Sequence, residues 1–212
     1  MKNGILIVVD GGNGAGKGTC LAQIDTYPRG RGFDVVLTRE PGGTHIGERI
    51  RELLLDKANS DMSSTTELLL FAAARAQHVQ EKIIPALTSG KIVVSDRFAS
   101  ATVSFQHYGR GLSLNLIAQL NDIALGGVKP SMTIVLDLDP AIGLQRVASR
   151  GAGLDRMEVE NLSFLQRARQ GYIAQARQDP EHFRIIDASQ SPSKVFIEAK
   201  ETIDEILLKE GY

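Results

Sequence analysis

One segment near the start of the chain has the residue types and spacing of a phosphate-binding loop. Residues 5–9 are all apolar, and a glycine-rich stretch that carries a single lysine, Lys17, follows them. Glycines let the backbone turn its N–H groups toward one point, where they and the positive end of a following helix attract an anion. The lysine can reach the outer phosphates as a point charge. The segment therefore predicts nucleoside triphosphate chemistry.

The loop departs from the usual phosphate-binding pattern at one position. Gly18 stands where a serine or threonine usually contacts magnesium, and Thr19 comes one residue later. A GKGT ending resembles that of the adenylate kinase branch of the nucleoside monophosphate kinases, in which the metal is held mainly by phosphates, water and carboxylates. We predict that the whole loop binds ATP. Its residues are Gly11, Gly12, Asn13, Gly14, Ala15, Gly16, Lys17, Gly18 and Thr19.

Two further segments place charged residues where a predicted strand ends. Residues 38–44 (TREPGGT) carry Arg39, and residues 93–98 (VVSDRF) carry Asp96 and Arg97. An aspartate there can orient magnesium or its waters, and an arginine can bind the phosphates that are being joined. Taken alone, a plain turn and a salt-bridged strand terminus explain the same residues.

Two other segments offer groups for a base and a sugar. Phe71 and Arg75 lie four residues apart and therefore share one face of a predicted helix. The ring can stack on a base and the guanidinium can donate to its carbonyl edge, although an amphipathic core helix would show the same spacing. Residues 104–111 (SFQHYGRG) add Phe105 and Gln106.

Residues 149–160 (SRGAGLDRMEVE) have the composition of a mobile flap. Arg150 precedes the glycines and Arg156 follows them. Arginines on a flap can close over transferring phosphates, whereas a solvated charged loop is the commoner meaning of such a segment.

The elements that position these groups alternate between strand and helix. Apolar runs predict buried strands at residues 5–9, 34–38, 91–95, 132–138 and 183–187. Helical patterns cover residues 44–55, 64–88, 113–125, 159–177 and 193–208. This alternation predicts an α/β fold with a parallel sheet, whose ligands gather at the carboxyl ends of the strands.

Composition limits the class of protein. The chain has 212 residues, of which 42% are hydrophobic and 23% charged, as in one ordinary globular domain. A net charge of -1 argues against a nucleic-acid partner. No apolar run is long enough for a membrane span and no secretory pattern is present, so we expect no membrane partner and a cytoplasmic location. The single cysteine, Cys20, is expected to be buried packing.

Six motifs resemble, in their order and spacing, those of bacterial-type thymidylate kinases, which are P-loop nucleoside monophosphate kinases. They are GGNGAGKGT, TREPGGT, LLLFAAARAQ, SDRF, FQHYGRG and LDRMEVE. The resemblance runs from about residue 5 to residue 176. It implies the three-layer P-loop NTPase fold, with a five-stranded parallel sheet flanked by helices. A single kinase domain would cover residues 1–212, with a lid at about residues 149–157.

The resemblance also implies an activity and its partners. Members of the family transfer a phosphoryl group from ATP to dTMP, giving ADP and dTDP in dTTP synthesis. Mg²⁺ is expected as cofactor, and a homodimer is expected as the assembly. The acceptor phosphate is largely dianionic near neutral pH, so the protein needs no strong general base and mainly positions and neutralises the reacting groups.

By position in the motifs, the resemblance assigns catalytic roles to four residues. Lys17 would follow the transferring phosphoryl group, and Arg97 would bind the acceptor phosphate. Asp96 would help to hold Mg²⁺, partly through water. Because residues 12–16 of the loop include no basic side chain, Arg150 of the lid would supply the additional positive charge.

The resemblance also implies where the acceptor nucleotide binds. Phe71 would stack on the pyrimidine, and Arg75 would donate to its exocyclic oxygen. Thr102 and Gln106 fall near the base and sugar, while Phe105 would press against the deoxyribose and disfavour a 2′-hydroxyl. The full predicted set is Asn13, Arg39, Phe71, Arg75, Arg97, Thr102, Phe105 and Gln106.

Several positions depart from the family pattern and bear on the acceptor. Asn13 stands where members usually carry an acid that takes the sugar 3′-hydroxyl, and Ala101 replaces a residue that is commonly polar. One alternative is therefore a kinase for another deoxypyrimidine monophosphate, dUMP or a 5-modified dUMP. A second alternative, from another class, is a nucleotide-binding protein that has lost turnover.

Overall fold

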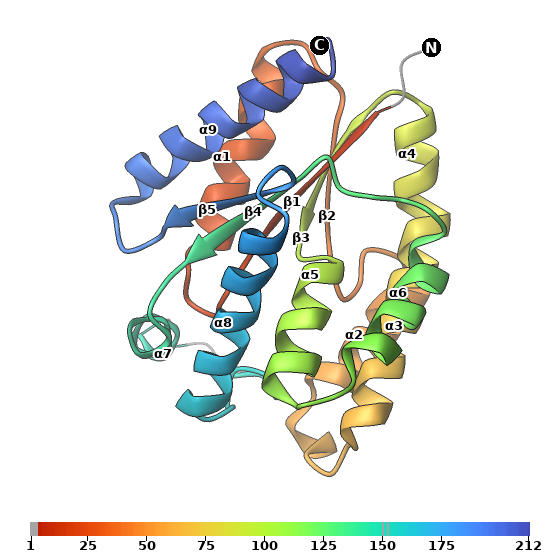
Figure 1. Cartoon of the computed structure of the whole chain (residues 1–212), viewed down its shortest axis with the longest axis vertical. Helices are drawn as coiled ribbons and strands as arrows, with labels where there is room; N and C mark the ends of the chain where they lie inside the picture. Colours follow the sequence, from red (N-terminus) through yellow and green to blue (C-terminus); the bar gives the residue numbers. More distant parts are fainter. Residues whose placement is uncertain (1–3, 150, 152) are drawn as a thin grey trace.

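The computed structural model describes residues 4–149, 151 and 153–212, and a parallel sheet forms its centre (Figure 1). Its strands are β1 (Ile5–Gly11), β2 (Val35–Arg39), β3 (Ile92–Asp96), β4 (Met132–Asp137) and β5 (Phe183–Asp187). They pair in parallel in the order β2-β3-β1-β4-β5. Every residue of β1 is buried because helices cover both faces of the sheet, which explains its continuous apolar sequence. The predicted α/β fold with five parallel strands is confirmed.

Helices form the two outer layers around this sheet. They are α1 (Lys17–Gly30), α2 (His45–Leu55), α3 (Ser64–His78), α4 (Ile84–Thr88), α5 (Ala99–Thr102), α6 (Leu114–Leu125), α7 (Pro140–Ala148), α8 (Leu162–Gln178) and α9 (Pro192–Lys209). A short 3-10 helix, η1 (Lys57–Asn59), and two π-helical segments, η2 (Val79–Ile83) and η3 (Val103–Gly109), complete the described elements. Within the described residues, none of these helices combines the length and apolar character needed to cross a bilayer.

Alternate residues of β1 enter different parts of the core. Ile5, Ile7 and Val9 pack with α1 and α9, which lie side by side on one face of the sheet (Figure 1). Leu6 and Val8 pack on the other face, against η2, α4 and Phe98. This two-residue alternation is the geometry of an extended strand buried on both sides.

The structure refines several predicted boundaries. The helix expected at residues 64–88 is present, but its middle is π-helical. The helix expected from residue 159 begins at Leu162, because the Asn161 side chain accepts a hydrogen bond from the backbone N–H of Phe164 and caps it. The sequence patterns did not predict α7 or the helical turns at residues 99–109.

The carboxyl ends of β1, β2 and β3 meet at one edge of the sheet. In the register of the strands, Asp96 lies beside Val9 on one side and beside Arg39 on the other. The loop that follows β1 therefore begins next to Asp96, which ends the adjacent strand β3, and Arg39 of β2 lies one strand further along the same edge.

Candidate active site

The loop between β1 and α1 is held by a close backbone contact with α7. Gly14 has a φ of 74°, and a Cβ built on it would lie 2.3 Å from the Gly143 carbonyl oxygen. Glycine is therefore required where the loop crosses α7. Among the described residues, no side chain caps the N-terminus of α1, so its first N–H groups face the loop as anion donors.

Lys17 folds back over the loop. Its Nζ donates to the carbonyl oxygens of Gly11 at 3.2 Å and Gly12 at 2.9 Å. A positive charge therefore lies at the mouth of the loop, where bound phosphates would meet it.

Arg97, which directly follows β3, connects the end of that strand to the phosphate loop through hydrogen bonds. Its Nη1 donates to Asp10 Oδ1 at 3.2 Å, to the Gly11 carbonyl at 3.0 Å and to the Tyr172 hydroxyl at 2.9 Å. Its Nη2 donates to Asn13 Oδ1 at 3.1 Å. Burial opposes its charge, but the electrostatic effects of Tyr172 and Asp10 outweigh burial and raise the pKa of Arg97. The guanidinium is therefore a fixed cation beside the phosphate loop.

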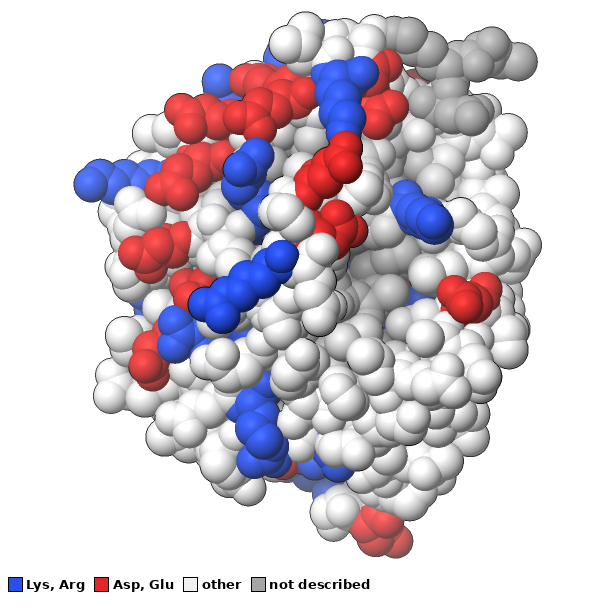
Figure 2. All heavy atoms as spheres, viewed as in Figure 1, with Lys and Arg blue, Asp and Glu red and all other residues white. Residues whose placement is uncertain are grey.

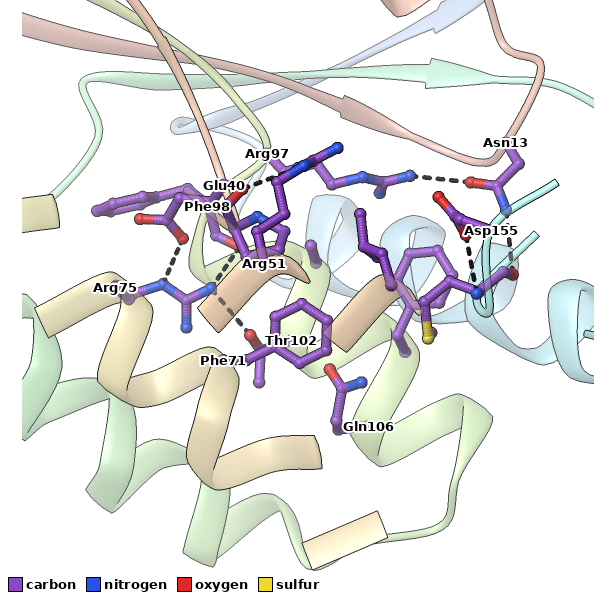
Figure 3. Close-up of a pocket in the computed structure, with 15 residues that line it drawn as sticks. Asn13, Glu40, Arg51, Phe71, Arg75, Arg97, Phe98, Thr102, Gln106 and Asp155 are labelled. Carbon is purple, nitrogen blue, oxygen red and sulfur yellow. Dashed lines mark hydrogen bonds and ion pairs between the residues drawn. The ribbon is translucent and has the colours of Figure 1, made fainter. Parts of the chain in front are cut away.

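A pocket opens beside Arg97 (Figure 3). It brings together every predicted substrate-binding residue except Arg39, whose side chain is exposed and pairs with Glu48 at 3.0 Å. The lining residues are Asn13, Glu40, Pro41, Arg51, Leu55, Phe71, Arg75, Arg97, Phe98, Ala101, Thr102, Phe105, Gln106, Asp155 and Met157. Phe71 projects into it from α3, while Thr102 and Gln106 line it from the helical turns of residues 99–109 (Figure 3).

Arg75 is buried in this wall with its guanidinium held from several sides. Its Nε donates to Glu40 at 2.8 Å, its Nη1 to Asn121 at 2.9 Å, and its Nη2 to Thr102 Oγ1 at 2.9 Å and to the Phe98 carbonyl at 3.1 Å. These bonds use four of the five N–H groups of the guanidinium. Because the Thr102 hydroxyl accepts from Arg75, its own hydrogen is left to donate, and the wall at Thr102 can act as a donor surface.

Sequence reasoning missed a third pocket arginine, Arg51 of α2. Its Nη1 donates to the Pro41 carbonyl at 2.8 Å. Burial, followed by the neighbouring charge of Arg39, lowers its pKa. The helical period offered a signal, because Gly47 and Leu54 are buried and Arg51 lies between them on the same face.

Asp96 lines a separate groove beside the N-terminus of α1. The groove also contains Gly18, Thr38, Arg39 and Glu48. Asp96 Oδ1 is buried and, within the described part of the chain, has no hydrogen-bond partner. A buried carboxylate oxygen without a partner suits a magnesium ion or one of its waters. No group of three or more His, Cys, Asp or Glu residues among those described could hold the ion, so phosphates and water would supply its other ligands.

A second missed residue, Arg146 of α7, lies on the other side of the loop. Its Nη1 donates to the Ala188 carbonyl at 3.2 Å and to the Gly14 carbonyl at 3.4 Å. Together with Thr19 and Cys20 it lines a hollow that adjoins the loop. Cys20 is buried, which raises its pKa to about 11, so the expectation of a packing residue is confirmed.

The sequence placed two arginines, Arg150 and Arg156, on the predicted lid, and the structure describes only one of them. Arg150 lies outside the described residues. Arg156, expected on the flap, is buried instead: its Nε donates to the Leu54 carbonyl at 2.7 Å and its Nη2 pairs with Glu67 at 2.7 Å. The expectation that Arg156 closes over phosphates is therefore wrong for this arrangement, because a buried carboxylate holds it.

Fold and site together define a class of protein. A glycine-rich loop with a lysine follows the central strand of a parallel sheet, and a carboxylate ends the neighbouring strand. Beside them lies an aromatic pocket with three arginines. This is the arrangement of a P-loop phosphotransferase with an acceptor pocket beside its phosphate loop.

Comparison with known proteins gives the family. A family model described as thymidylate kinase matches residues 9–198. The chain is 48% identical to a thymidylate kinase of Ectopseudomonas mendocina (strain ymp), over 91% of each chain, and 44% identical to one of Desulfovibrio desulfuricans (strain ATCC 27774 / DSM 6949 / MB), over 98% of each. The crystal structure of thymidylate kinase from Ehrlichia chaffeensis matches with a TM-score of 0.75 and 31% identity, over 95% of this chain and 99% of that one. The chain belongs to the thymidylate kinase family. It is a nucleoside monophosphate kinase, which sets aside the alternative of a protein without turnover.

The glycine requirement at the loop gives a first prediction. Gly14→Ala should lower the free energy of unfolding by about 1–3 kcal/mol, because the methyl group meets the Gly143 carbonyl and φ is positive. Gly12→Ala is the control, since a Cβ there meets no atom of the described residues within 4 Å. Denaturant unfolding of both variants checks this, and equal stabilities would contradict the packing argument.

Proposed function

We propose that the chain transfers the γ-phosphoryl group of ATP to dTMP, giving ADP and dTDP in dTTP synthesis. One observation carries the proposal: the aromatic, donor-lined pocket shares Arg97 with the phosphate loop. An acceptor in the pocket and a donor on the loop would therefore bring their phosphates to the same cation. Membership of the thymidylate kinase family supports the identity of both nucleotides.

The acceptor base is proposed to lie against Phe71. Its ring offers a stacking face, and Arg75 in the same wall offers donors to a carbonyl edge. Thr102, Phe105 and Gln106 complete this end of the pocket.

The acceptor phosphate is proposed to lie between Arg97 and Arg51. Both guanidiniums line the pocket, and Arg97 also contacts the loop through the Gly11 carbonyl. Arginine suits a phosphate dianion because its planar fork donates two parallel hydrogen bonds. The acceptor oxygen needs no deprotonation, so these residues act by position and charge.

ATP is proposed to bind along residues 11–19, with Lys17 at its outer phosphates. Arg146 and the hollow beside it adjoin the loop and offer room for the rest of the nucleotide. The lid at residues 149–157, including Arg150, would close over the phosphates and exclude water within a single kinase domain.

Mg²⁺ is proposed as the cofactor, with Asp96 as the protein group that helps to hold it or its waters. Among the described residues, Oδ1 of Asp96 has no hydrogen-bond partner and the space beside Gly18 is open, and both observations support this assignment. When bound, the ion would neutralise charge on the phosphates.

Asn13 is proposed to face the acceptor sugar, although its Oδ1 already accepts from Arg97 and its Nδ2 donates to the Met157 carbonyl at 3.3 Å.

The proposal includes a homodimer in the cytoplasm, where ATP is available. Exposed large apolar side chains on neighbouring helices α2, α3 and α6 support a partner surface. They are Ile46, Leu53, Leu69, Leu114, Leu116 and Ile123. Figure 2 shows charges of both signs gathered over α9, and few charges on the side of α6.

Replacing the loop lysine tests the catalytic assignment. Lys17→Met should lower kcat about 10²–10³-fold, because a preorganised charge at the transferring phosphoryl group is lost. Steady-state ADP formation with ATP, Mg²⁺ and dTMP measures this. Lys129→Met, at an exposed site, should keep the wild-type rate; the same rate in the Lys17 variant would refute the role of that residue.

Removing the stacking face tests the acceptor site. Phe71→Ala should raise the KM for dTMP about tenfold or more, because base–aromatic stacking is worth about 1–3 kcal/mol. The KM for ATP should stay near the wild-type value. Phe196→Ala removes a ring that packs on Tyr27 instead and should change neither KM. Equal rises in both KM values for the Phe71 variant would contradict stacking.

A further inference from the structure

A buried carboxylate behind the pocket has no part in the chemistry described so far. Glu67, in the first turn of α3, is 1% exposed. Its Oε1 accepts from Gln106 Nε2 at 2.9 Å and from Arg110 Nε at 3.0 Å. Its Oε2 accepts from Arg110 Nη2 at 2.9 Å and pairs with Arg156 Nη2 at 2.7 Å. One carboxylate thus holds a pocket-lining amide and two guanidiniums.

The charges around Glu67 keep it ionised at neutral pH. Burial alone would raise its pKa, but hydrogen bonds from Arg110 and Gln106 and the charge of Arg156 outweigh burial and hold the pKa below its usual value. An ionised carboxylate accepts hydrogen bonds and donates none.

Because the Glu67 carboxylate can only accept hydrogen bonds, it fixes the orientation of the Gln106 amide. Only the NH₂ group of Gln106 can face Glu67, so its carbonyl oxygen must lie on the other side. Gln106 lines the pocket, and Figure 3 shows its oxygen directed toward the space below Phe71. A bound ligand therefore meets an acceptor at this point.

A donor surface stands next to this acceptor. Thr102 and Gln106 are one helical turn apart, and Arg75 Nη2 donates to the Thr102 hydroxyl at 2.9 Å. A pyrimidine with a 4-carbonyl beside a ring N–H offers the complementary acceptor and donor. A 4-amino pyrimidine offers the reverse pattern, and would set donor against donor and acceptor against acceptor.

We propose that Glu67 is a positioning residue: by holding the Gln106 amide with its carbonyl toward the pocket, it selects 4-oxo pyrimidine monophosphates over 4-amino ones. The inference rests on the proposed function and adds the residue that sets this preference. Glu67 acts through Gln106 and touches no substrate.

The test compares dTMP and dCMP as acceptors for the intact chain. Glu67→Gln replaces a carboxylate by an amide that can also donate a hydrogen bond. The Gln106 amide can then rotate so that its NH₂ group, instead of its carbonyl oxygen, faces the pocket. The ratio of kcat/KM for dTMP to that for dCMP should fall about tenfold, the cost of one mismatched buried hydrogen bond, while the KM for ATP stays unchanged. Glu160→Gln is the matched control: it removes the other carboxylate that pairs with Arg110, at 2.6 Å, and should keep the wild-type ratio.

A double-mutant cycle separates positioning from general stability. In a Gln106→Ala background, Glu67→Gln should change the ratio no further, because the amide through which it acts is gone. If thermal unfolding shows that Glu67→Gln does not fold, Glu67→Asp keeps the charge, withdraws the carboxylate from Gln106 and should lower the ratio likewise.

The outcomes distinguish this inference from the proposed function. A wild-type ratio in a folded Glu67 variant, or the same fall of the ratio with Gln106 already removed, would overturn the positioning role and leave the kinase proposal intact. A wild-type chain that phosphorylated no dTMP would overturn both.

Discussion

The buried carboxylate of Asp10 is the constraint on which the site depends. It lies near the end of the central strand, fully buried, and a charge there must have partners. Tyr172 of α8, Ser100 of α5, Arg97 after β3 and the backbone N–H of Gly11 all donate to it. Two segments that are distant in the sequence, residues 97–100 and α8, are therefore held around the start of the phosphate loop.

Arg97 links the buried Asp10 to the groups that would bind the phosphates. Its backbone takes a φ of 69°, which is uncommon for a residue with a side chain, and its guanidinium is fixed by Asp10 and the loop. Phosphoryl transfer asks the protein mainly to hold two phosphates in line and to neutralise their charge. A cation shared by the loop and the acceptor pocket does both, and the two buried acids Glu40 and Glu67 orient the polar groups at the base end of that pocket.

The sequence was sufficient for features that depend on local pattern. The five strands, the loop, and the shared face of Phe71 and Arg75 follow from apolar runs, glycine spacing and helical period. The helical period marks the face of α2 that carries Arg51, but it does not show which pocket that face meets. The position of Arg146 and the burial of Arg156 depend on how distant segments pack together, and no local pattern encodes that. The hydrogen bonds of Arg75 could not be predicted for the same reason, since its partner Glu40 lies 35 positions away in the sequence.

The most direct test measures ADP formation by the wild-type chain with ATP and Mg²⁺, offering dTMP, dUMP, 5-hydroxymethyl-dUMP, dCMP and dGMP separately. The account predicts rapid turnover with dTMP, identified by dTDP as the product, and little with dCMP or dGMP. Faster turnover with dUMP or its 5-modified form would make Asn13 and Ala101 determinants of a different acceptor. Turnover that ignored the acceptor, or no turnover at all, would contradict the account.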